Sequence, residues 1–538
     1  MGNVKAILAF GILQGTLMAA GALPVSSYLI GENSFNADTP AKDADRTWGR
    51  MKEARFRLIR IGGISNNDKT PSAESHARWI DSIRSIGAEP LVQVSSIDPA
   101  STAADLVRAL NVQKKYGVRF WCIGNEQTCV EKPSAAKMAT IAANAKERAL
   151  AMKAVDPGIK ILFGDECYWK PEFYGPLIGG ANDVTGEANG IRYIDGVTFH
   201  TYPLPGASKE TPYTRNDVLF NAIPNVRGQF MNCRKAAAAA DSMHGRTGAA
   251  RLSISLTEFN VTYWNSSDNS PAGVGVRSFL AGQFVAEVFG MGIENGAFTV
   301  APWSMMESGG NGGAGDLGLF DGNGAVVPRP AYHHIKMIAD NMSGTGITAV
   351  VEKADLLHAY ATQNGDTAAI LLLNENLANG YRITVKLNSG GAGSASTPTV
   401  RADAGWDGEL TDTVPAQSTL LLKIRKPGVV ATRTVYTLPM AEKFQAPTVK
   451  EFPVALGQAR SRTAAQFRIL NGRLEGDLET SGPYHVELMD GKGRVVSELS
   501  GYGNAWTLGS EGSGTSLRWL RVSASGKTWV ALVPPRDP

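Results

Sequence analysis

Eight short apolar runs between residues 26 and 342 constrain the fold of this chain more than any other feature. Each run is rich in β-branched and aliphatic residues, and amphipathic stretches separate the runs. The runs are residues 26–29, 57–61, 90–94, 119–123, 159–163, 193–199, 252–256 and 297–300. Eight alternating strand and helix units are the number that closes a parallel sheet into a barrel. The sequence therefore predicts an α/β fold built on a (β/α)8 TIM barrel.

The stretches between the runs support helices. Apolar residues recur at three-to-four spacing in residues 72–86, 99–116, 134–155, 216–242 and 276–290. A doubly wound open sheet is the competing α/β architecture, and it requires a glycine-rich phosphate loop after its first strand. Gly31-Glu32-Asn33-Ser34 is not such a loop. The pattern therefore favours the closed barrel.

Three further segments are expected after the barrel, to which we assign residues 23–342. Residues 343–425 contain short alternating strands with turns at Asn364-Gly365 and Asn379-Gly380, which is typical of an antiparallel β-sandwich. Residues 426–464 mix Pro, Lys and Arg with few periodic apolar residues and indicate a linker. A small β module is predicted at residues 465–538.

The first 22 residues are organised like a secretory signal peptide. Lys5 precedes an apolar stretch, and Ala20-Gly21-Ala22 offers a small-residue cleavage site. An uncleaved anchor is the alternative, but the stretch is short for a membrane span and no other window is apolar enough for one. We expect a protein that is secreted or held at the cell surface and has no membrane span after signal removal.

Charge and cysteine content exclude several kinds of partner. The 53 Lys and Arg residues against 50 Asp and Glu leave a net charge of +3, which is too weak to indicate nucleic acid binding. The four cysteines lack C-x-x-C spacing, so a cysteine zinc site is not indicated. A disulfide between Cys129 and Cys167 and a pair of unpaired buried thiols are both compatible with the sequence.

Glutamates follow two of the predicted strands, where barrel enzymes place their catalytic groups. Glu126 follows the fourth run, and Glu258 follows the seventh. The C-terminal ends of barrel strands meet at one rim, so both carboxyl groups can face one bound sugar. Glycosidic cleavage uses such a pair, with one protonated carboxyl for the leaving oxygen and one carboxylate at the anomeric carbon. This chemistry requires neither a metal nor another cofactor.

Four motifs in this order resemble those of the clan A glycoside hydrolases, which are retaining enzymes with a (β/α)8 barrel. Asn125-Glu126 resembles the acid/base motif after strand four, and Thr257-Glu258-Phe259-Asn260 resembles the nucleophile motif of strand seven. Arg60-Ile61-Gly62-Gly63 is similar to the arginine motif of strand two, and His200-Thr201-Tyr202 to the His-x-Tyr motif after strand six. The resemblance implies that Glu126 is the acid/base, that Glu258 is the nucleophile and that Asn125 binds the sugar 2-hydroxyl.

Further residues at the strand ends are candidate contacts of the site. Arg60 and Tyr202 are expected to donate hydrogen bonds to Glu258, and the arginine to lower the pKa of that carboxyl. Trp303 offers a flat face on which a pyranose can stack. The remaining candidates are His200, Tyr263, Trp264, Glu32, Asn33 and Glu166.

The substrate class follows from weaker resemblances. Glu258-Phe259-Asn260-Val261 with Tyr263-Trp264 resembles the nucleophile region of the arabinofuranosidase family. Asp316-Leu317-Gly318-Leu319-Phe320 and Arg329-Pro330-Ala331-Tyr332 resemble β-xylosidase-like and endoglucanase-like members. We expect a retaining hydrolase of a plant cell-wall or extracellular polysaccharide or its oligosaccharides. The alternatives are a transglycosylase and a non-catalytic polysaccharide-binding surface protein.

The C-terminal module carries a separate resemblance. Val486-Glu487-Leu488-Met489-Asp490 followed by Gly493-Arg494-Val495-Val496 resembles the sorting domains of the type IX secretion route. That resemblance implies a secretion machinery as a partner. A carbohydrate-binding module or another β module fits the same pattern.

Overall fold

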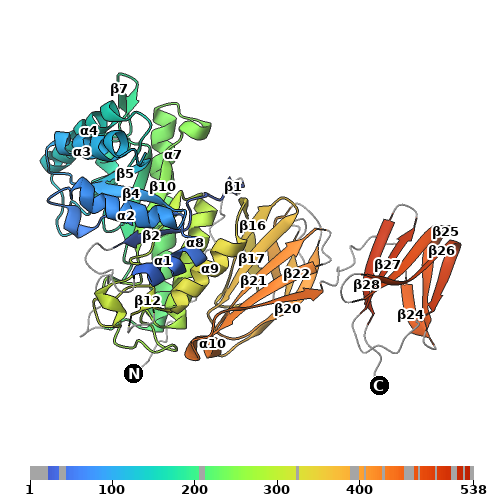
Figure 1. The fold of residues 1–538 in the computed structure, drawn as a ribbon. Helices are drawn as coiled ribbons and strands as arrows, with labels where there is room; N and C mark the ends of the chain where they lie inside the picture. The colour runs from blue at the N-terminus through green and yellow to red at the C-terminus, as the bar shows by residue number, and fades with distance from the viewer. Residues whose placement is uncertain are drawn as a thin grey trace, which may run out of the picture.

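The computed structural model describes most of the chain in twelve segments. These are residues 22–34, 44–204, 212–322, 326–387, 399–404, 408–426, 430–453, 466–470, 473–490, 494–509, 518–524 and 527–533. The predicted signal peptide, apart from residue 22, lies outside the described residues. Figure 1 shows the barrel, the β-sandwich that follows it and the separate C-terminal sheet.

The predicted (β/α)8 barrel is confirmed. Eight strands form one sheet in which all neighbours are parallel. In chain order they are β2 (Gly31–Ser34), β3 (Leu58–Ile61), β4 (Glu89–Val94), β5 (Phe120–Ile123), β6 (Lys160–Phe163), β9 (Gly196–Thr201), β10 (Ser253–Phe259) and β11 (Thr299–Val300). A parallel bridge between Ile30 and Val300 brings the first and last strands together, so the sheet curls into a nearly closed barrel.

The first strand begins later than predicted. Residues 26–29 were expected to form it, but β2 is Gly31–Ser34, all of it buried. The apolar run was misleading because the barrel accepts a polar strand whose groups find partners inside. Nδ2 of Asn33 donates to the carbonyl oxygens of Thr257 at 2.8 Å and Pro302 at 3.1 Å. Local hydrophobicity could not reveal those partners.

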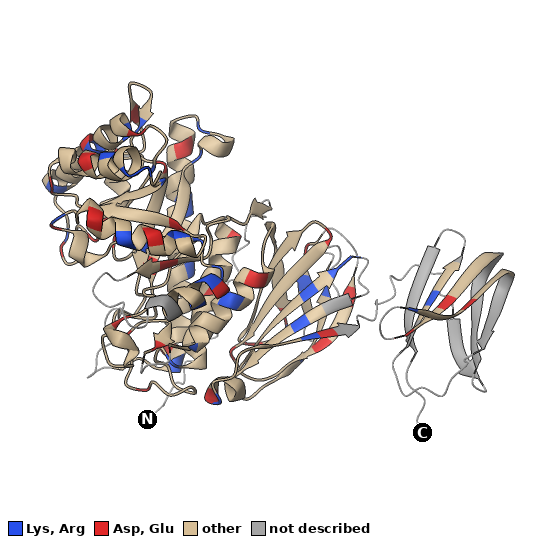
Figure 2. Ribbon diagram, viewed as in Figure 1, with Lys and Arg blue, Asp and Glu red and all other residues tan. Residues whose placement is uncertain are grey.

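Helices cover the outside of the barrel (Figure 1). The principal ones are α1 (Ala44–Glu53), α2 (Ala73–Ser85), α3 (Ala100–Val107), α4 (Ala135–Val155), α5 (Pro171–Leu177), α7 (Ile223–Met243), α8 (Phe279–Asn295) and α9 (Pro330–Asn341). Serine caps begin three of them, with Ser72, Ser134 and Ser278 each accepting a backbone N–H from the first turn. Figure 2 shows basic and acidic residues interspersed over the ribbon, as the small net charge suggests.

Strand alternation separates the two faces of the barrel wall. On β3, Ile59 and Ile61 belong to the main core, whereas Leu58 packs inside the barrel with Leu91 and Leu162. Arg60 shares the inward parity of Leu58, one step nearer the C-terminal rim. The alternation along β3 therefore places apolar side chains in the lower barrel interior and Arg60 above them, at the C-terminal end of the barrel.

Two sheets, one antiparallel and one mixed, form the β-sandwich. One contains β1 (Leu23–Pro24), β14 (Thr345–Ile347), β16 (Leu357–Asn364), β17 (Thr367–Asn374), β21 (Ser418–Arg425), β22 (Val430–Thr437) and β23 (Thr448–Pro453). The other contains β15 (Ala349–Glu352), β19 (Thr399–Ala402), β18 (Tyr381–Lys386) and β20 (Glu409–Val414), with β18 and β19 parallel. Leu371 and Leu373 of β17 join the barrel core, while Ile370 and Leu372 join the sandwich core. This sheet is buried on both faces, which explains the continuous apolar run in β17.

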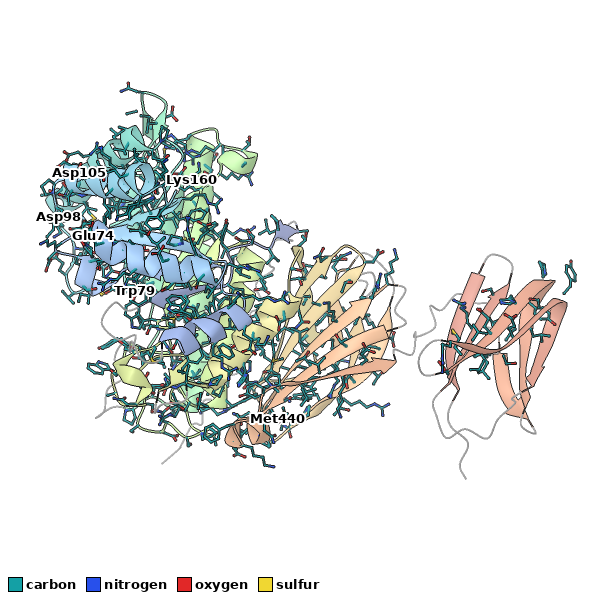
Figure 3. All side chains as sticks on the ribbon, in the orientation of Figure 1. Glu74, Trp79, Asp98, Asp105, Lys160 and Met440 are labelled. Atoms are coloured by element: carbon teal, nitrogen blue, oxygen red, sulfur yellow. A yellow bond between two sulfur atoms is a disulfide. The ribbon has the colours of Figure 1, made fainter. Side chains whose placement is uncertain are left out.

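The predicted linker at residues 426–464 is wrong for residues 430–453. These residues form β22, the short helix α10 (Leu438–Glu442) and β23, which extend the larger sandwich sheet. The buried positions of β22 include Thr434 and Tyr436, so its inward face lacks the aliphatic residues that mark a strand. Met440 on α10, labelled in Figure 3, packs partly buried against the barrel core.

The C-terminal module is a five-stranded antiparallel unit. Its strands are β24 (Gln466–Leu470), β25 (Arg473–Met489), β26 (Val495–Gly509), β27 (Arg518–Ala524) and β28 (Lys527–Val533). Its assignment as a sorting domain stays a prediction. Among the described residues, no helix combines the length and the apolar character that crossing a bilayer requires.

Candidate active site

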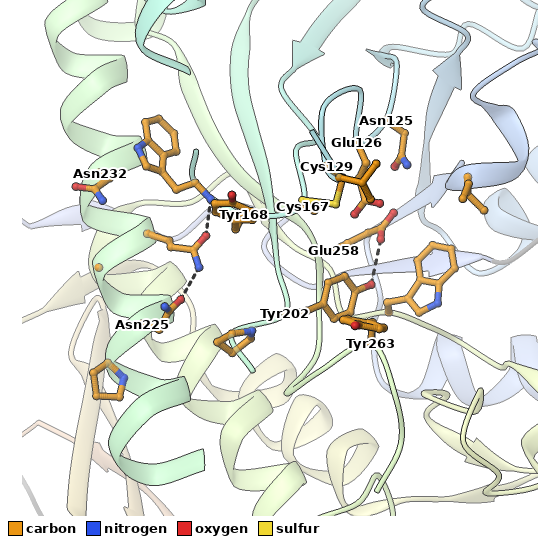
Figure 4. A pocket seen from close by; sticks show the side chains of 18 residues that line it. Asn125, Glu126, Cys129, Cys167, Tyr168, Tyr202, Asn225, Asn232, Glu258 and Tyr263 are labelled. Carbon is orange, nitrogen blue, oxygen red and sulfur yellow. Dashed lines mark hydrogen bonds between the residues drawn. A yellow bond between two sulfur atoms is a disulfide. The ribbon is translucent and has the colours of Figure 1, made fainter. Parts of the chain in front are cut away.

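Glu126 and Glu258 face each other at the C-terminal rim of the barrel. Glu258 lies on β10, and Glu126 lies in the loop that follows β5. A carboxylate oxygen of each lies within 4.8 Å of the other and of a ring nitrogen of His200. The Glu258 side chain is 7% exposed and that of Glu126 is 23% exposed. The two glutamates therefore share one pocket in two different environments (Figure 4).

A β-bulge sets the direction of Glu258. The pairing of β10 with β9 shifts between Leu256 and Glu258, so Thr257 has no partner in the register. A bulge turns neighbouring side chains of one strand out of strict alternation. Thr257 consequently bonds Asp165 inside the barrel while Glu258 faces the cavity.

Arg60 connects the polar residues below the two glutamates. Its Nη1 lies 2.6 Å from Oε1 of Glu258, and its Nη2 lies 2.7 Å from Oδ1 of Asn125. The same guanidinium also donates to Asn33, Gln93 and Asp165. The planar fork of arginine supplies donors in several fixed directions, which a lysine does not. Arg60 thus orients the glutamate and the asparagine together.

The pKa of Glu258 is raised above its usual value. Burial raises it, and the positive charges of His200 and Arg60 oppose this without cancelling it. Arg60 does lower the pKa of Glu258, as expected from the sequence. The net pKa is nevertheless raised, because the carboxyl is almost fully desolvated. Tyr202 adds a second donor, with its Oη 3.1 Å from Oε2 of Glu258.

His200 stands between the carboxylates as a buried cation. Its Nδ1 lies 3.1 Å from Oε1 of Glu126 and 3.7 Å from Oε2 of Glu258. Burial lowers its pKa, but the charge of Glu258 and the interactions with Asp165 and Glu126 outweigh burial and raise the pKa to about 10.

Asp165 is a residue of the site that sequence analysis missed. It accepts hydrogen bonds from Nη2 of Arg60 at 3.1 Å and from Oγ1 of Thr257 at 2.5 Å. Burial raises its pKa, but Arg60 and His200 outweigh burial, so the pKa lies well below its usual range. The signal was its position two residues after β6, directly before Glu166, which was singled out instead.

The loop that carries Glu126 is held from both sides. Glu126 has a positive φ of 47°, and its backbone N–H donates to the carbonyl oxygen of Asp165 at 2.7 Å. Left-handed backbone at a residue other than glycine is maintained only where its surroundings impose it. Three residues further along, Cys129 forms a disulfide with Cys167, so the structure supports the disulfide and not the unpaired thiols for these two cysteines. Cys122 and Cys233 are free and buried.

The glutamates open into a cavity of about 1050 Å³. Figure 4 shows Glu126, Glu258 and Tyr202 on one side of it and Asn225 and Asn232 of α7 on the other. Its wall includes both cysteines of the disulfide and the side chains Ile64, Val130, Tyr168, Trp169, Pro203, Pro224, Gln229, Tyr263 and Trp303. The volume is that of a large small-molecule binding site. The polar side chains of α7 that line the cavity, Asn225, Gln229 and Asn232, had no signal in sequence, because they lie on an otherwise ordinary amphipathic helix.

Known proteins share this architecture. No family model matches the chain. A stretch of 211 residues is 26% identical to the intracellular exo-alpha-(1->5)-L-arabinofuranosidase 1 of Bacillus subtilis (strain 168), and it covers 37% of this chain and 36% of that protein. The chain therefore matches about a third of the length of this curated relative.

Solved structures extend the likeness over most of the chain. The alpha-L-arabinofuranosidase of Thermotoga maritima, in its arabinose complex, has a TM-score of 0.53 at 16% identity over 76% of this chain and 98% of its own. A monomeric beta-xylosidase from Caulobacter crescentus CB15 has a TM-score of 0.52 at 14% identity over 91% and 97%. A bifunctional glucanase-xylanase from a metagenome library has a TM-score of 0.51 at 15% identity, over 75% of this chain and 97% of its own. At these identities the likeness establishes the fold.

The aromatic candidates lie at or near the cavity. Trp303 and Tyr263 line it, and Trp264 lies beside Tyr263 with ring centroids 6.0 Å apart. Trp303 packs over Gly63, whose φ of 100° suits glycine and where a Cβ would lie 2.8 Å from the indole. Tyr263 and Trp264 are about half exposed, so their rings are accessible to a ligand at the rim.

Three other candidates do not reach the cavity. Glu166 is fully buried and accepts the backbone N–H and the hydroxyl of Thr128, so it supports the disulfide loop. Glu32 is also fully buried, and burial raises its pKa well above the usual value. Asn33 bonds Arg60 and backbone carbonyls. The predicted direct contact of these three residues with substrate is therefore not supported, because Glu166 and Asn33 bond within the protein and Glu32 is buried away from the cavity.

Proposed function

We propose that this protein is a retaining glycoside hydrolase in which Glu258 is the nucleophile and Glu126 the acid/base. One observation carries the proposal, namely the carboxylate oxygens of Glu126 and Glu258 within 4.8 Å of each other. Retaining enzymes hold their carboxyl groups about 5–5.5 Å apart, whereas inverting enzymes leave about 6.5–9.5 Å for a water molecule. A non-catalytic binding protein has no need for this proximity.

The environments of the two glutamates suit different roles. Glu258 receives hydrogen bonds from Arg60 and Tyr202, so its ionised form is supported where an oxocarbenium-like centre develops. Glu126 is the more exposed of the pair and faces His200.

The reaction then runs in two displacements. An oxygen of Glu258 bonds to the anomeric carbon as the bond to the leaving oxygen breaks, and the proton of Glu126 passes to that oxygen. Glu126 next takes a proton from water, whose oxygen attacks the anomeric carbon and breaks the bond to Glu258. Asn125, oriented by Arg60, is placed to bind the sugar 2-hydroxyl. Trp303 supplies a stacking face.

For the substrate we propose an arabinose- or xylose-containing plant cell-wall or extracellular polysaccharide, or its oligosaccharides. Support comes from the names of the similar proteins, an exo-alpha-(1->5)-L-arabinofuranosidase, an alpha-L-arabinofuranosidase and a beta-xylosidase. The volume of the cavity is consistent with an oligosaccharide. We also propose export, supported by the signal-like N-terminus and by the Cys129–Cys167 disulfide, a bond typical of oxidising compartments.

The test compares wild-type protein with Glu258→Gln and with the control Glu131→Gln, an exposed glutamate of the Glu126 loop. Each is assayed on aryl α-L-arabinofuranosides and β-D-xylosides and on arabinan, xylan and glucan, and ¹H NMR follows the anomer first released. We expect turnover with retention in wild type and in Glu131→Gln, and a loss of at least about 10³-fold in Glu258→Gln. Inversion, or full activity in Glu258→Gln, would overturn the mechanism. Binding without turnover would favour the binding protein, and transfer to an added sugar would favour the transglycosylase.

A further inference from the structure

A second cluster of ionisable side chains lies where the barrel meets the sandwich. Glu287 belongs to α8, His358 to β16, and Glu375 directly follows β17. One donor atom of each lies within 4.8 Å of the other two. Both carboxylates are fully buried, whereas the His358 side chain is 36% exposed. The cluster thus has a buried floor and one side open to solvent.

The carboxylate of Glu375 lacks hydrogen bonds. Both of its oxygens are buried, and neither has a hydrogen-bond partner among the described residues. The nearby guanidinium of Arg215 donates to the backbone carbonyl of Glu375 instead of to its carboxylate. Oε2 of Glu375 lies 3.8 Å from Nδ1 of His358, too far for a hydrogen bond. Burying a bare carboxylate in this position is very costly, and a cation bound between Glu375 and its neighbours would offset that cost.

Glu287, in contrast, is firmly oriented. Its Oε1 lies 2.6 Å from Nδ1 of His358, and its Oε2 accepts a hydrogen bond of 2.5 Å from Oη of Tyr360. Arg227 donates to the same hydroxyl at 2.8 Å and forms an ion pair with Glu294 at 2.6 Å. The charge of Arg227 is therefore shared with Glu294. Outer hydrogen bonds of this kind hold metal-binding carboxylates in place.

We propose that Glu287, His358 and Glu375 bind one Zn²⁺ ion that ties helix α8 of the barrel to the sandwich. Zinc takes imidazole nitrogen and carboxylate oxygen at about 2.0–2.2 Å, so two of its ligand atoms lie at most about 4.3 Å apart. The 3.8 Å gap between His358 and Glu375 fits one bridging ion. On binding, zinc would take the place of the proton that Nδ1 of His358 shares with Glu287, and that proton would pass to solvent. Two carboxylates neutralise the ion, and water completes its coordination on the exposed side of His358.

The donor set also selects among cations. An imidazole in a set of three suits zinc, whereas Ca²⁺ and Mg²⁺ prefer sites made of oxygen alone. The ion would be structural, because the cluster lies outside the residues that line the catalytic cavity. The site is therefore independent of the proposed hydrolase activity, and its test does not use activity.

The experiment measures metal content of the full chain, produced without a histidine tag. Protein is stripped with EDTA, dialysed against Zn²⁺ and then against metal-free buffer, and analysed by mass spectrometry of the metal. We expect about one Zn²⁺ per wild-type chain and none retained in Glu375→Gln or His358→Ala. The control His485→Ala alters another imidazole near carboxylates, in the C-terminal module, and is expected to keep the ion.

Thermal unfolding provides the second measurement. Zinc is expected to raise the Tm of stripped wild type and to leave that of Glu375→Gln unchanged, since a ligand that binds only the folded state stabilises it. Glu375→Gln is nearly isosteric, and circular dichroism checks its fold. Failure of wild type to bind zinc with a Kd below about 1 μM, or zinc retained by both variants, would overturn the proposal. Saturation by Ca²⁺ and not Zn²⁺ would overturn the choice of ion.

Discussion

Nη1 of Arg60 lies 2.6 Å from Oε1 of Glu258, although the two residues are 198 positions apart in the chain. Both side chains are nearly fully buried, at 1% and 7% exposed. Burial lowers the pKa of Arg60, but Asp165 and Glu258 outweigh burial and raise it, so the guanidinium stays charged. The pair therefore supplies a permanent positive charge beside the proposed nucleophile, in a site where water cannot screen it.

Arg60→Lys should impair both catalysis and stability. A lysine keeps the charge but cannot reach the five acceptors of Arg60, and each buried acceptor left without a partner costs about 1–3 kcal/mol. We expect kcat/KM to fall by about 10²–10³-fold and the free energy of unfolding in urea to fall as well. The control is Arg57→Lys, an exposed arginine next to β3, which should change neither value. An active, fully stable Arg60→Lys would contradict the assigned role.

Glu126→Ala should make the rate depend on the leaving group. Without a proton donor, a poor leaving group departs slowly, whereas 4-nitrophenolate departs without protonation. We expect a loss of about 10²–10⁴-fold on an oligosaccharide and a much smaller loss of the first step on the 4-nitrophenyl glycoside. Pre-steady-state release of nitrophenol measures that step. Equal losses on both substrates would argue against Glu126 as the acid.

The pH profile should respond to His200. The charge of His200 lowers the pKa of Glu258 and partly offsets the effect of burial. His200→Gln removes that charge, so the Glu258 pKa rises and the carboxylate forms only at higher pH. The acidic limb of kcat/KM should therefore move to higher pH, with the largest loss of activity in acid.

The control for this shift is His244→Gln. His244 pairs with Asp183 at 2.9 Å and does not line the cavity. Its profile should coincide with that of wild type. An acidic limb that stays in place, or moves to lower pH, in His200→Gln would show that His200 does not influence Glu258 as argued.

Reduction of the Cys129–Cys167 disulfide should destabilise the protein and weaken substrate binding. The bond closes a loop between cysteines 38 positions apart, and such a loop contributes about 2–4 kcal/mol by restricting the unfolded chain. Because both cysteines line the cavity, KM should rise more than kcat falls. Denaturation and kinetics with and without reductant measure both effects. The double variant Cys129→Ser with Cys167→Ser should have the stability and kinetics of reduced wild type, and reductant should not change them. Reductant should still change the stability and kinetics of Cys233→Ala.

The ends of most barrel strands could be predicted from the sequence. A strand that is buried between the helices and the barrel interior appears in the sequence as an uninterrupted apolar run. Glu126, Glu258 and His200 were identified by their positions after such runs. β2 was misplaced and β22 was missed for the opposite reason, since their buried residues include Glu32, Asn33 and Thr434, whose neighbours come from other segments. Asp165 was passed over although it occupies the same kind of position as Glu126.

The sequence by itself determined the barrel, the sandwich and the two glutamates at its strand ends, because local periodicity and strand order decide which residues reach the rim. The tertiary structure alone decided what those residues do to one another. It turned Glu258 toward the cavity through a bulge at Thr257 and joined Cys129 to Cys167. It also placed Glu375 beside His358 and Glu287 without a hydrogen-bond partner among the described residues. Burial, distance and charge between segments far apart in the chain are properties of packing, and no local pattern encodes them.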